Sequence, residues 1–295
     1  MKRTLVSGMG RLIGAEFLKL RKRSMTWVLL GILVFLIVLV NLLLLAISKV
    51  AVPPQGNAAV HSILGPQAAV PFALSLIANL GALLAIVLAA SSMGNEYNWK
   101  TIRTALISSE SRFKFLTAKL VSMSLMILIG MVVGIVVAII MSFITNAIAG
   151  NSFDFSFLTG SYVWDQFLQF WRTFFVIVPF AALGFMMSIV GRSAMPGIAT
   201  GIGVFFAESI ITAFMRLAGG WIANVPDYLL AANVQAITSL NQLPGGFGMR
   251  VGGSNGAAAG NTAVSLPHAY ITLGLYAVAF LILAFYLFRK RDVTG

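Results

Sequence analysis

The 295-residue sequence contains no cysteine and only two histidines. Without cysteine the chain can form neither a disulfide framework nor a thiolate metal site, and it has no cysteine nucleophile. The two histidines, His61 and His268, are far apart in the sequence, which argues against a histidine metal cluster. The sequence therefore predicts no metal site.

Charged residues are also scarce. They make up 9% of the chain, with eight acids against 20 bases, whereas soluble domains carry about 25% charged residues. Hydrophobic residues account for 59%, and the mean hydropathy is +0.95. There is too little polar surface to solvate a globule, so the composition predicts an integral membrane protein.

Six apolar stretches are long enough to cross a bilayer as helices, which takes about 20 residues each. We predict all-α spans at residues 25–48, 71–93, 120–148, 171–190, 195–217 and 268–288. Only residues 191–194 separate the fourth from the fifth, so this pair forms either a tight helical hairpin or one long kinked region. The first run exceeds the roughly 7–15 apolar residues of a signal peptide, so we interpret it as a retained span.

The basic residues are distributed unequally about these spans. With a cytoplasmic N-terminus, 16 of the 20 bases lie inside, and the four outside are Lys49, Arg172, Arg216 and Arg250. This asymmetry follows the positive-inside rule and explains the net charge of +12 better than nucleic-acid binding does. We predict cytoplasmic termini, a cytoplasmic helix over residues 1–24 and a six-span domain over residues 25–295.

An amphipathic pattern precedes the first span. On one side of a helix lie the apolar residues Leu5, Met9, Leu12, Ile13, Phe17 and Leu20. Glu16 interrupts this apolar stripe, Leu18 lies opposite it, and bases occupy the other side. Such a helix is expected along the inner leaflet. It either holds the first span in place as a basic collar or also contacts a partner subunit.

A polar segment, residues 94–119, joins the second and third spans and has a helical pattern of its own. Its apolar members at helical spacing are Trp99, Ile102, Leu106 and Ile107. The bases between and after them are Lys100, Arg103 and Arg112. Aliphatic and aromatic anchors beside bases suit a docking patch, and the surface it meets is either lipid headgroups or a cytosolic protein. Ser109 is placed to cap the next helix.

The order of several motifs is informative. Glu16-Phe-Leu-Lys-Leu-Arg-Lys-Arg precedes the first span; Gly94-Asn-Glu-Tyr, Thr101-Ile-Arg-Thr-Ala-Leu, Ser111-Arg-Phe-Lys and Ala118-Lys-Leu follow the second. In this arrangement the whole chain resembles the type-2 permease subunits of bacterial ATP-binding-cassette transporters. In that family the N-terminal helix and the loop between spans two and three dock a separate cytosolic ATPase subunit.

The resemblance implies a function and a set of coupling residues. These residues are Glu16, Glu96, Tyr97, Trp99, Lys100, Thr101, Ile102, Arg103, Leu106 and Arg112. It also implies a bacterial or archaeal plasma membrane, a second permease copy or homologue, and ATP-driven export along the dimer seam. The alternative within the same assembly is a membrane subunit that senses or signals.

No nucleotide site is recognisable on the chain itself. A P-loop requires Gly-x-x-x-x-Gly-Lys-Ser/Thr, and Gly8, Gly10 and Gly14 have neither this spacing nor the lysine. We therefore expect ATP and Mg²⁺ on the partner ATPase, no cofactor here, and no enzymatic activity of this chain. A membrane-embedded enzyme would need clustered polar groups within the spans, and Glu208 has no evident catalytic partner in the sequence. A secondary transporter usually has two related halves with broken helices, and the two halves of this sequence do not look alike. Both classes are therefore disfavoured.

Three further features of the spans and loops invite hypotheses. Gly130 with Gly134, and Gly197 with Gly201, have the spacing of close helix packing, either internal or at a dimer seam. Glu208 lies near the middle of the fifth span, where a carboxylate is costly; it is structurally paired or protonated, or it lines a pathway or dimer seam. The external loop after the fifth span contains an amphipathic stretch, residues 229–240, opened by Pro226 and Asp227; the resemblance implies a cap over the pathway.

Overall fold

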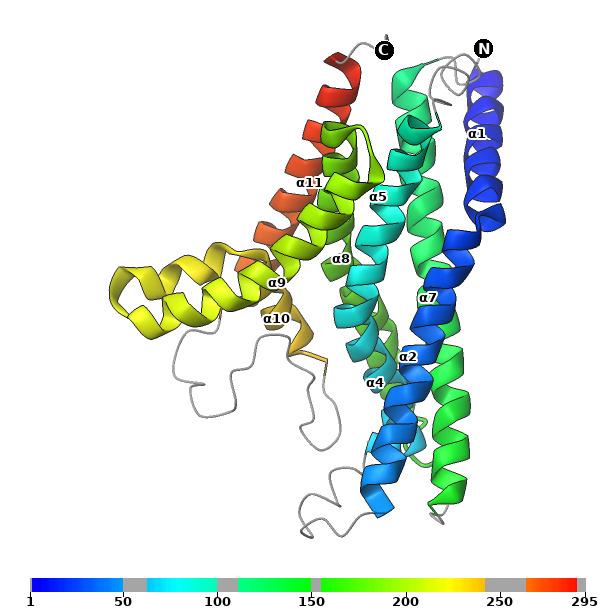
Figure 1. Cartoon of the computed structure of the whole chain (residues 1–295). Helices are drawn as coiled ribbons and strands as arrows, with labels where there is room; N and C mark the ends of the chain where they lie inside the picture. The colour runs from blue at the N-terminus through cyan, green and yellow to red at the C-terminus, as the bar shows by residue number, and fades with distance from the viewer. Residues whose placement is uncertain (1, 50–62, 100–110, 150–154, 242–263, 291–295) are drawn as a thin grey trace.

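The structure is a computed structural model that describes residues 2–49, 63–99, 111–149, 155–241 and 264–290. Within these ranges it is helical and contains no strand. Six helical stretches are long and apolar enough to cross a membrane: α2 (Ser24–Lys49), Pro66–Asn98, α7 (Arg112–Ile148), α8 (Gly160–Gly191), α9 (Ala194–Ala218) and α11 (Leu266–Lys290) (Figure 1). The predicted all-α architecture is confirmed for the described residues, and six of their helical stretches have the length and hydropathy of membrane spans.

The fourth and fifth predicted spans are separate helices that form a hairpin. Arg192 and Ser193 make the turn between α8 and α9, and Arg192 adopts a left-handed backbone with φ of 52°. The Ser193 hydroxyl accepts a 3.5 Å hydrogen bond from the Met195 N–H and caps α9. The structure therefore selects the hairpin over the single kinked region.

The second span is interrupted by a wider helical turn. It consists of η1 (Pro66–Ala68), α4 (Ala69–Leu76), the π-helical segment η2 (Ile77–Gly81) and α5 (Ala82–Asn98). Insertions of π-helix are rare and often occur at functional sites. This one changes which side chains the second span presents to α7.

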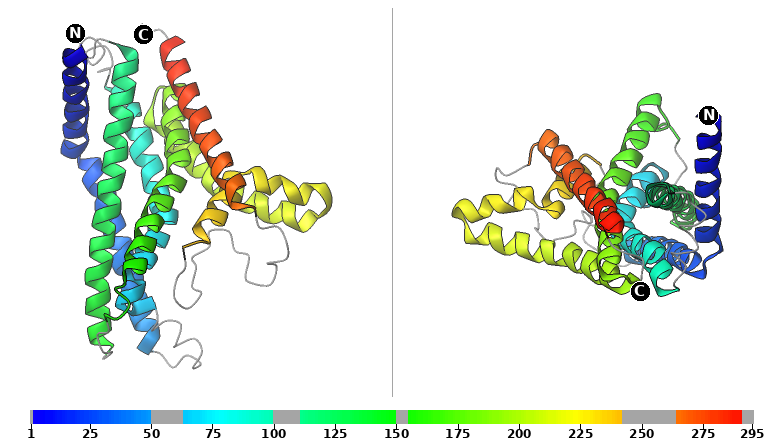
Figure 2. Two further views of the ribbon diagram at one scale, coloured as in Figure 1. Left: turned by 180° about the vertical axis from the view of Figure 1, so that it is seen from behind. Right: turned by 90° about the horizontal axis from the view of Figure 1, so that it is seen from above.

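Helices α5 and α8 form the centre of the bundle. The most apolar windows of the second and fourth spans are 61% and 67% buried, against 11% for α9. Figures 1 and 2 show α9 leaving the bundle obliquely, so that its C-terminal half and η3 (Gly220–Tyr228) project to one side. The chain then returns through α10 (Leu230–Thr238), which packs on α11. The predicted helix at residues 229–240 is thus present, although Pro226 and Asp227 belong to η3 and do not open α10.

The N-terminal helix α1 (Lys2–Lys22) packs obliquely against α7. Leu20 of the predicted apolar stripe is buried in the core, and Leu18 on the opposite side is 51% exposed. The Ser122 hydroxyl of α7 donates a 3.0 Å hydrogen bond to the carbonyl of Ile13. Amphipathicity of this segment was thus predicted correctly, and α7 covers part of its buried side.

One end of the bundle, which we call the basic end, carries the start of α1, the α8–α9 turn and the last turn of α11 (Figure 1). From residue 8 onward, the bases on α1, directly after α1, in the first turns of α7, in the α8–α9 turn and at the end of α11 are Arg11, Lys19, Arg21, Lys22, Arg23, Arg112, Lys114, Lys119, Arg192, Arg289 and Lys290. The uneven distribution of bases along the sequence thus becomes a charge difference between the two ends of the folded bundle.

Helices α5, α8 and α9 approach one another through small residues. A Cβ on Gly197 would lie 2.5 Å from the Gly184 carbonyl oxygen and 2.7 Å from Ala90 Cβ, and one on Gly201 would lie 2.4 Å from Ile86 Cγ2. Near the basic end, a Cβ on Gly94 would meet the backbone nitrogen of Ala194 at 2.1 Å. The Gly197–Gly201 pair therefore serves internal packing, as one of the two hypotheses held.

The two glycines of the other pair, Gly130 and Gly134, differ in how closely they are packed. A Cβ on Gly134 would lie 3.0 Å from Ile77 Cδ1 and 3.2 Å from Ile37 Cδ1, so this position is closely packed. A Cβ on Gly130 would meet only Leu30 Cδ1, at 4.0 Å. Internal packing, one of the two hypotheses for this pair, is thus found at Gly134 and not at Gly130, which adjoins open space between the helices; a dimer seam at Gly130 stays a prediction.

We predict that Gly197→Ala destabilises the protein, because the new methyl group cannot avoid the Gly184 backbone. Overpacking of this kind costs about 1–3 kcal/mol. Gly203→Ala is the matched control on the same helix, since nothing lies within 4 Å of its Cβ; it should be neutral or slightly stabilising because alanine favours helices by about 1 kcal/mol over glycine. Thermal unfolding in detergent compares the two, and equal melting temperatures would contradict the packing assignment.

Candidate functional site

A cluster of buried charges joins three helices at the basic end. Lys119 of α7 places its Nζ 2.7 Å from Glu16 Oε2 of α1 and 3.3 Å from Glu96 Oε1 of α5. The same ammonium donates to the carbonyl oxygen of Ser92 at 3.2 Å. Lys119, Glu16 and Glu96 are 1%, 4% and 2% exposed. We call these three residues the buried ion cluster.

Two further bases adjoin the buried ion cluster from its outer side. Lys19 Nζ lies 2.6 Å from Glu16 Oε1 on the same helix, and Arg23 Nη2 lies 3.2 Å from Glu96 Oε1. Three positive groups therefore face two carboxylates, so each carboxylate is paired twice or more. Buried charges persist only when they are paired and hydrogen-bonded in this way.

Sequence position explains why these groups meet. Glu16 interrupts the apolar stripe of α1, and Lys119 stands among the buried residues Leu116, Ala118 and Ser122 of α7. If the helices separated, Lys119 would lose both carboxylates, and Glu16 would keep, among the described bases, only Lys19 of its own helix. Their pairing fixes the register of α1 along α7 as well as the contact of both helices with the last turns of α5.

The last residues of α5 lead to the exposed surface. Trp99 is 60% exposed, and the Arg23 guanidinium lies 5.1 Å from its ring centroid. Tyr97 packs partly buried against the core. Arg23 thus connects the buried Glu96 with an exposed aromatic ring at the end of the second span.

The start of α7 is attached to the last helix. Arg112 Nη1 donates to the carbonyl oxygens of Arg289 at 2.9 Å and Phe288 at 3.5 Å, and so satisfies acceptors at the C-terminus of α11. Ser111 caps α7 by accepting from the Lys114 N–H at 3.1 Å. The predicted cap, Ser109, lies outside the described residues, and the α7 cap is two positions further along.

The structure places the predicted coupling residues in different environments. Glu16 and Glu96 belong to the buried ion cluster, Trp99 is exposed, and Arg112 contacts α11. Five others lie outside the described residues: Lys100, Thr101, Ile102, Arg103 and Leu106. The sequence analysis did not predict the roles of Lys119 and Arg23. The one signal for Lys119 was its position at the start of a long apolar run.

Glu208 lies away from this cluster, on the part of α9 that leaves the bundle. Its Oε2 accepts a 2.7 Å hydrogen bond from the backbone N–H of Ala231, in the first turn of α10. The α10 N-cap residue, Leu229, offers no side-chain cap, so Glu208 takes that role from another helix. The carboxylate is structurally paired, which was one of the two hypotheses for this residue.

The segment held by Glu208 is also attached to α11. His268 Nε2 lies 3.1 Å from the carbonyl oxygen of Asp227, and the Tyr276 hydroxyl donates to the carbonyl of Tyr228 at 3.1 Å. In the ranges given above, no three His, Asp or Glu side chains come together as metal ligands would. The Glu208, His268 and Tyr276 side chains bond to backbone atoms and thereby hold the end of η3 and the start of α10 in place.

The fold defines a multi-pass membrane protein with six apolar helices. Residues 63–294 match the model of a family described as "Protein of unknown function (DUF2705)", and since this is more than half of the 295 residues, the chain belongs to that family. The chain is also similar to the "Uncharacterized protein YhcI" of Bacillus subtilis (strain 168), with 25% identity over 224 residues. That alignment covers 73% of this chain and 66% of the relative, just under two thirds of the relative's length.

We predict that Lys119→Met strongly destabilises the protein, because Glu16 and Glu96 lose the ammonium between them. Removing one partner of a buried ion pair costs about 3–5 kcal/mol, or a melting temperature lower by roughly 10 °C. Lys22→Met, at an exposed lysine of α1, is the control and should change the melting temperature little. Equal effects of the two substitutions in detergent would show that the cluster does not hold the helices together.

We predict that Glu208→Ala loosens α10 locally and leaves the bundle folded. Loss of an N-cap interaction costs about 1 kcal/mol, so the amide hydrogens of residues 230–233 should exchange several-fold faster in hydrogen–deuterium exchange. Glu208→Gln keeps an oxygen acceptor and should retain most of the protection. Unchanged exchange in the alanine variant would contradict the capping role and favour the pathway hypothesis.

Proposed function

We propose that the chain is the transmembrane permease subunit of an ATP-binding-cassette exporter in a plasma membrane, with its basic end in the cytoplasm. Two permease copies, or one copy and a homologue, would form the pathway, and separate cytosolic ATPase subunits would bind ATP and Mg²⁺. The basic end carries the majority of the described bases, as the positive-inside rule requires of cytoplasmic segments.

The observation that carries this proposal is Lys119 bridging Glu16 and Glu96. These charges join α1 to α5 and α7, the two helices that flank residues 100–110. A force applied to α1 or to this segment is therefore transmitted to the second and third spans together. A permease driven by a separate ATPase needs such a connection between its docking surface and its spans.

The proposal divides the coupling residues into two roles. Glu16 and Glu96 are buried, so they hold the helices together and do not touch the ATPase. Trp99, exposed and next to Arg23, begins the docking surface, which continues along the sequence through Lys100, Ile102 and Leu106. Aromatic residues and arginines are enriched at the centres of protein interfaces.

The first test identifies what the chain binds. Tagged protein, extracted from its native membrane in mild detergent, should co-purify with a P-loop ATPase subunit at about one per chain, identified by mass spectrometry. The proposal is wrong if no such ATPase accompanies the wild-type chain while the six-span protein remains folded.

The second test locates the docking surface. We predict that joint replacement of Trp99, Ile102 and Leu106 by Asp releases the ATPase, because each buried apolar anchor contributes about 1.5–3 kcal/mol and each 1.4 kcal/mol is roughly tenfold in affinity. Trp221→Asp on η3, where Trp221 is 77% exposed, is the control and should leave the ATPase bound. An ATPase retained at wild-type stoichiometry by the triple variant would contradict this assignment.

A further inference from the structure

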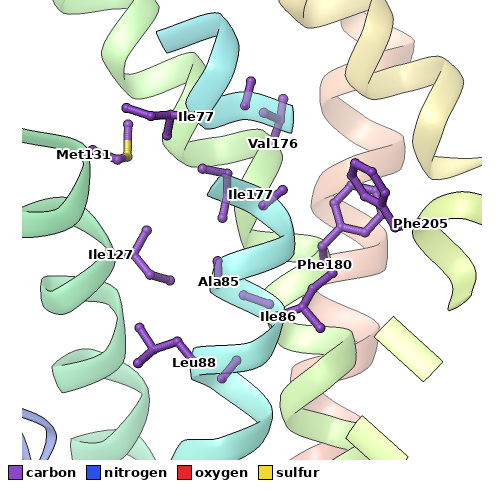
Figure 3. Close-up of a cluster of buried hydrophobic side chains, with 14 of the residues drawn as sticks. Ile77, Ala85, Ile86, Leu88, Ile127, Met131, Val176, Ile177, Phe180 and Phe205 are labelled. Carbon is purple, nitrogen blue, oxygen red and sulfur yellow. The ribbon is translucent and has the colours of Figure 1, made fainter. Parts of the chain in front are cut away.

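A groove of about 300 Å³ lies between α2, α7 and the second span. Its walls are apolar, and Figure 3 shows Ile127 and Met131 of α7 facing Ile77, Ala85 and Leu88 across the space between the two helices. This volume is at the lower end of the range of small-molecule pockets, about 300–1,000 Å³. The groove is too apolar to favour water, and an apolar ligand matches its lining.

Small residues on facing helices keep the groove open. Gly130 of α7 has only Leu30 Cδ1 within 4.0 Å of its Cβ position. On the opposite wall stand Ala85 and Gly81, the latter at the end of the π-helical segment η2. The open space lies at Gly130, because a Cβ on Gly81 would already meet Ile77 Cγ2 at 3.0 Å.

Among the described residues that line the groove, Arg21 is the one base. Arg21, at the end of α1, lines it beside Trp27 of α2, and the Trp27 indole N–H donates to the Arg21 carbonyl at 2.8 Å. The Arg21 side chain forms no salt bridge with any residue that the structure describes. Apart from Arg21, Trp27 and Thr26, every described residue that lines the groove is apolar.

We propose that the groove binds one anionic phospholipid from the leaflet at the basic end, with an acyl chain against Gly130 and the phosphate on Arg21. The apolar walls match a hydrocarbon chain, and the guanidinium matches a phosphate by charge and hydrogen-bond geometry. Trp27, 56% exposed at the mouth, is a residue type that favours the headgroup level of a bilayer. This inference does not depend on the proposed transport function.

The test uses protein reconstituted in nanodiscs of phosphatidylcholine with a minor share of phosphatidylglycerol. The protein is extracted into detergent and washed, and retained lipids are counted by native mass spectrometry. Wild-type protein should retain about one phosphatidylglycerol per chain, and Gly130→Leu, which fills the groove, should reduce this at least fivefold. Gly31→Leu is the matched control, because it adds the same side chain to α2 in open space and Gly31 does not line the groove.

A second variant tests the headgroup contact without altering the core. Arg21→Gln should lower the preference for phosphatidylglycerol over phosphatidylcholine at least threefold, whereas Lys22→Gln, at the adjacent exposed base, should not. The proposal fails if Gly130→Leu retains lipid as wild type does, or if Arg21→Gln and Lys22→Gln behave alike. It also fails if delipidated wild type is a dimer that Gly130→Leu converts to monomer with no change in bound lipid, since a second copy then covers the groove.

Discussion

The buried ammonium of Lys119 is the constraint on which the basic end of the molecule depends. It contacts carboxylates from two other helices and one backbone carbonyl, and it is 1% exposed. A charge buried to this extent is tolerated only while every partner stays in place. Helices α1, α5 and α7 therefore have to remain together at this end of the bundle.

Close backbone contact plays the corresponding role on the other side of α5. Gly94 lies against the start of α9. Because Gly197 and Gly201 have no side chain, α8 and α5 approach the backbone of α9 closely. In a bilayer, where lipid is as apolar as leucine, van der Waals packing of this kind drives helix association. The α8–α9 hairpin is held on α5 by shape, whereas α1 and α7 are held on it by charge.

Helix α5 is common to all of these features. Its last turns carry Glu96 and Gly94, and its first turns, with the π-helical segment before them, form one wall of the groove. A displacement of its end at the basic side would act on the ion cluster and on the packing with α9 at once. In the proposed exporter this helix would carry motion from the docking surface into the spans, next to a bound lipid.

The sequence by itself determined the class of protein and the number of apolar helices, because length and hydropathy decide whether a helix can cross a bilayer. It also located the amphipathic N-terminal helix and the small residues of α9. It did not identify Lys119, because a lysine near the start of an apolar run has the pattern of an ordinary flanking base until its partners are known. Nor did it separate Gly130 from Gly134, or show that Glu208 caps α10. These three were decided by tertiary structure alone, since each depends on which residue of another helix lies opposite, and helical periodicity carries no information about that pairing.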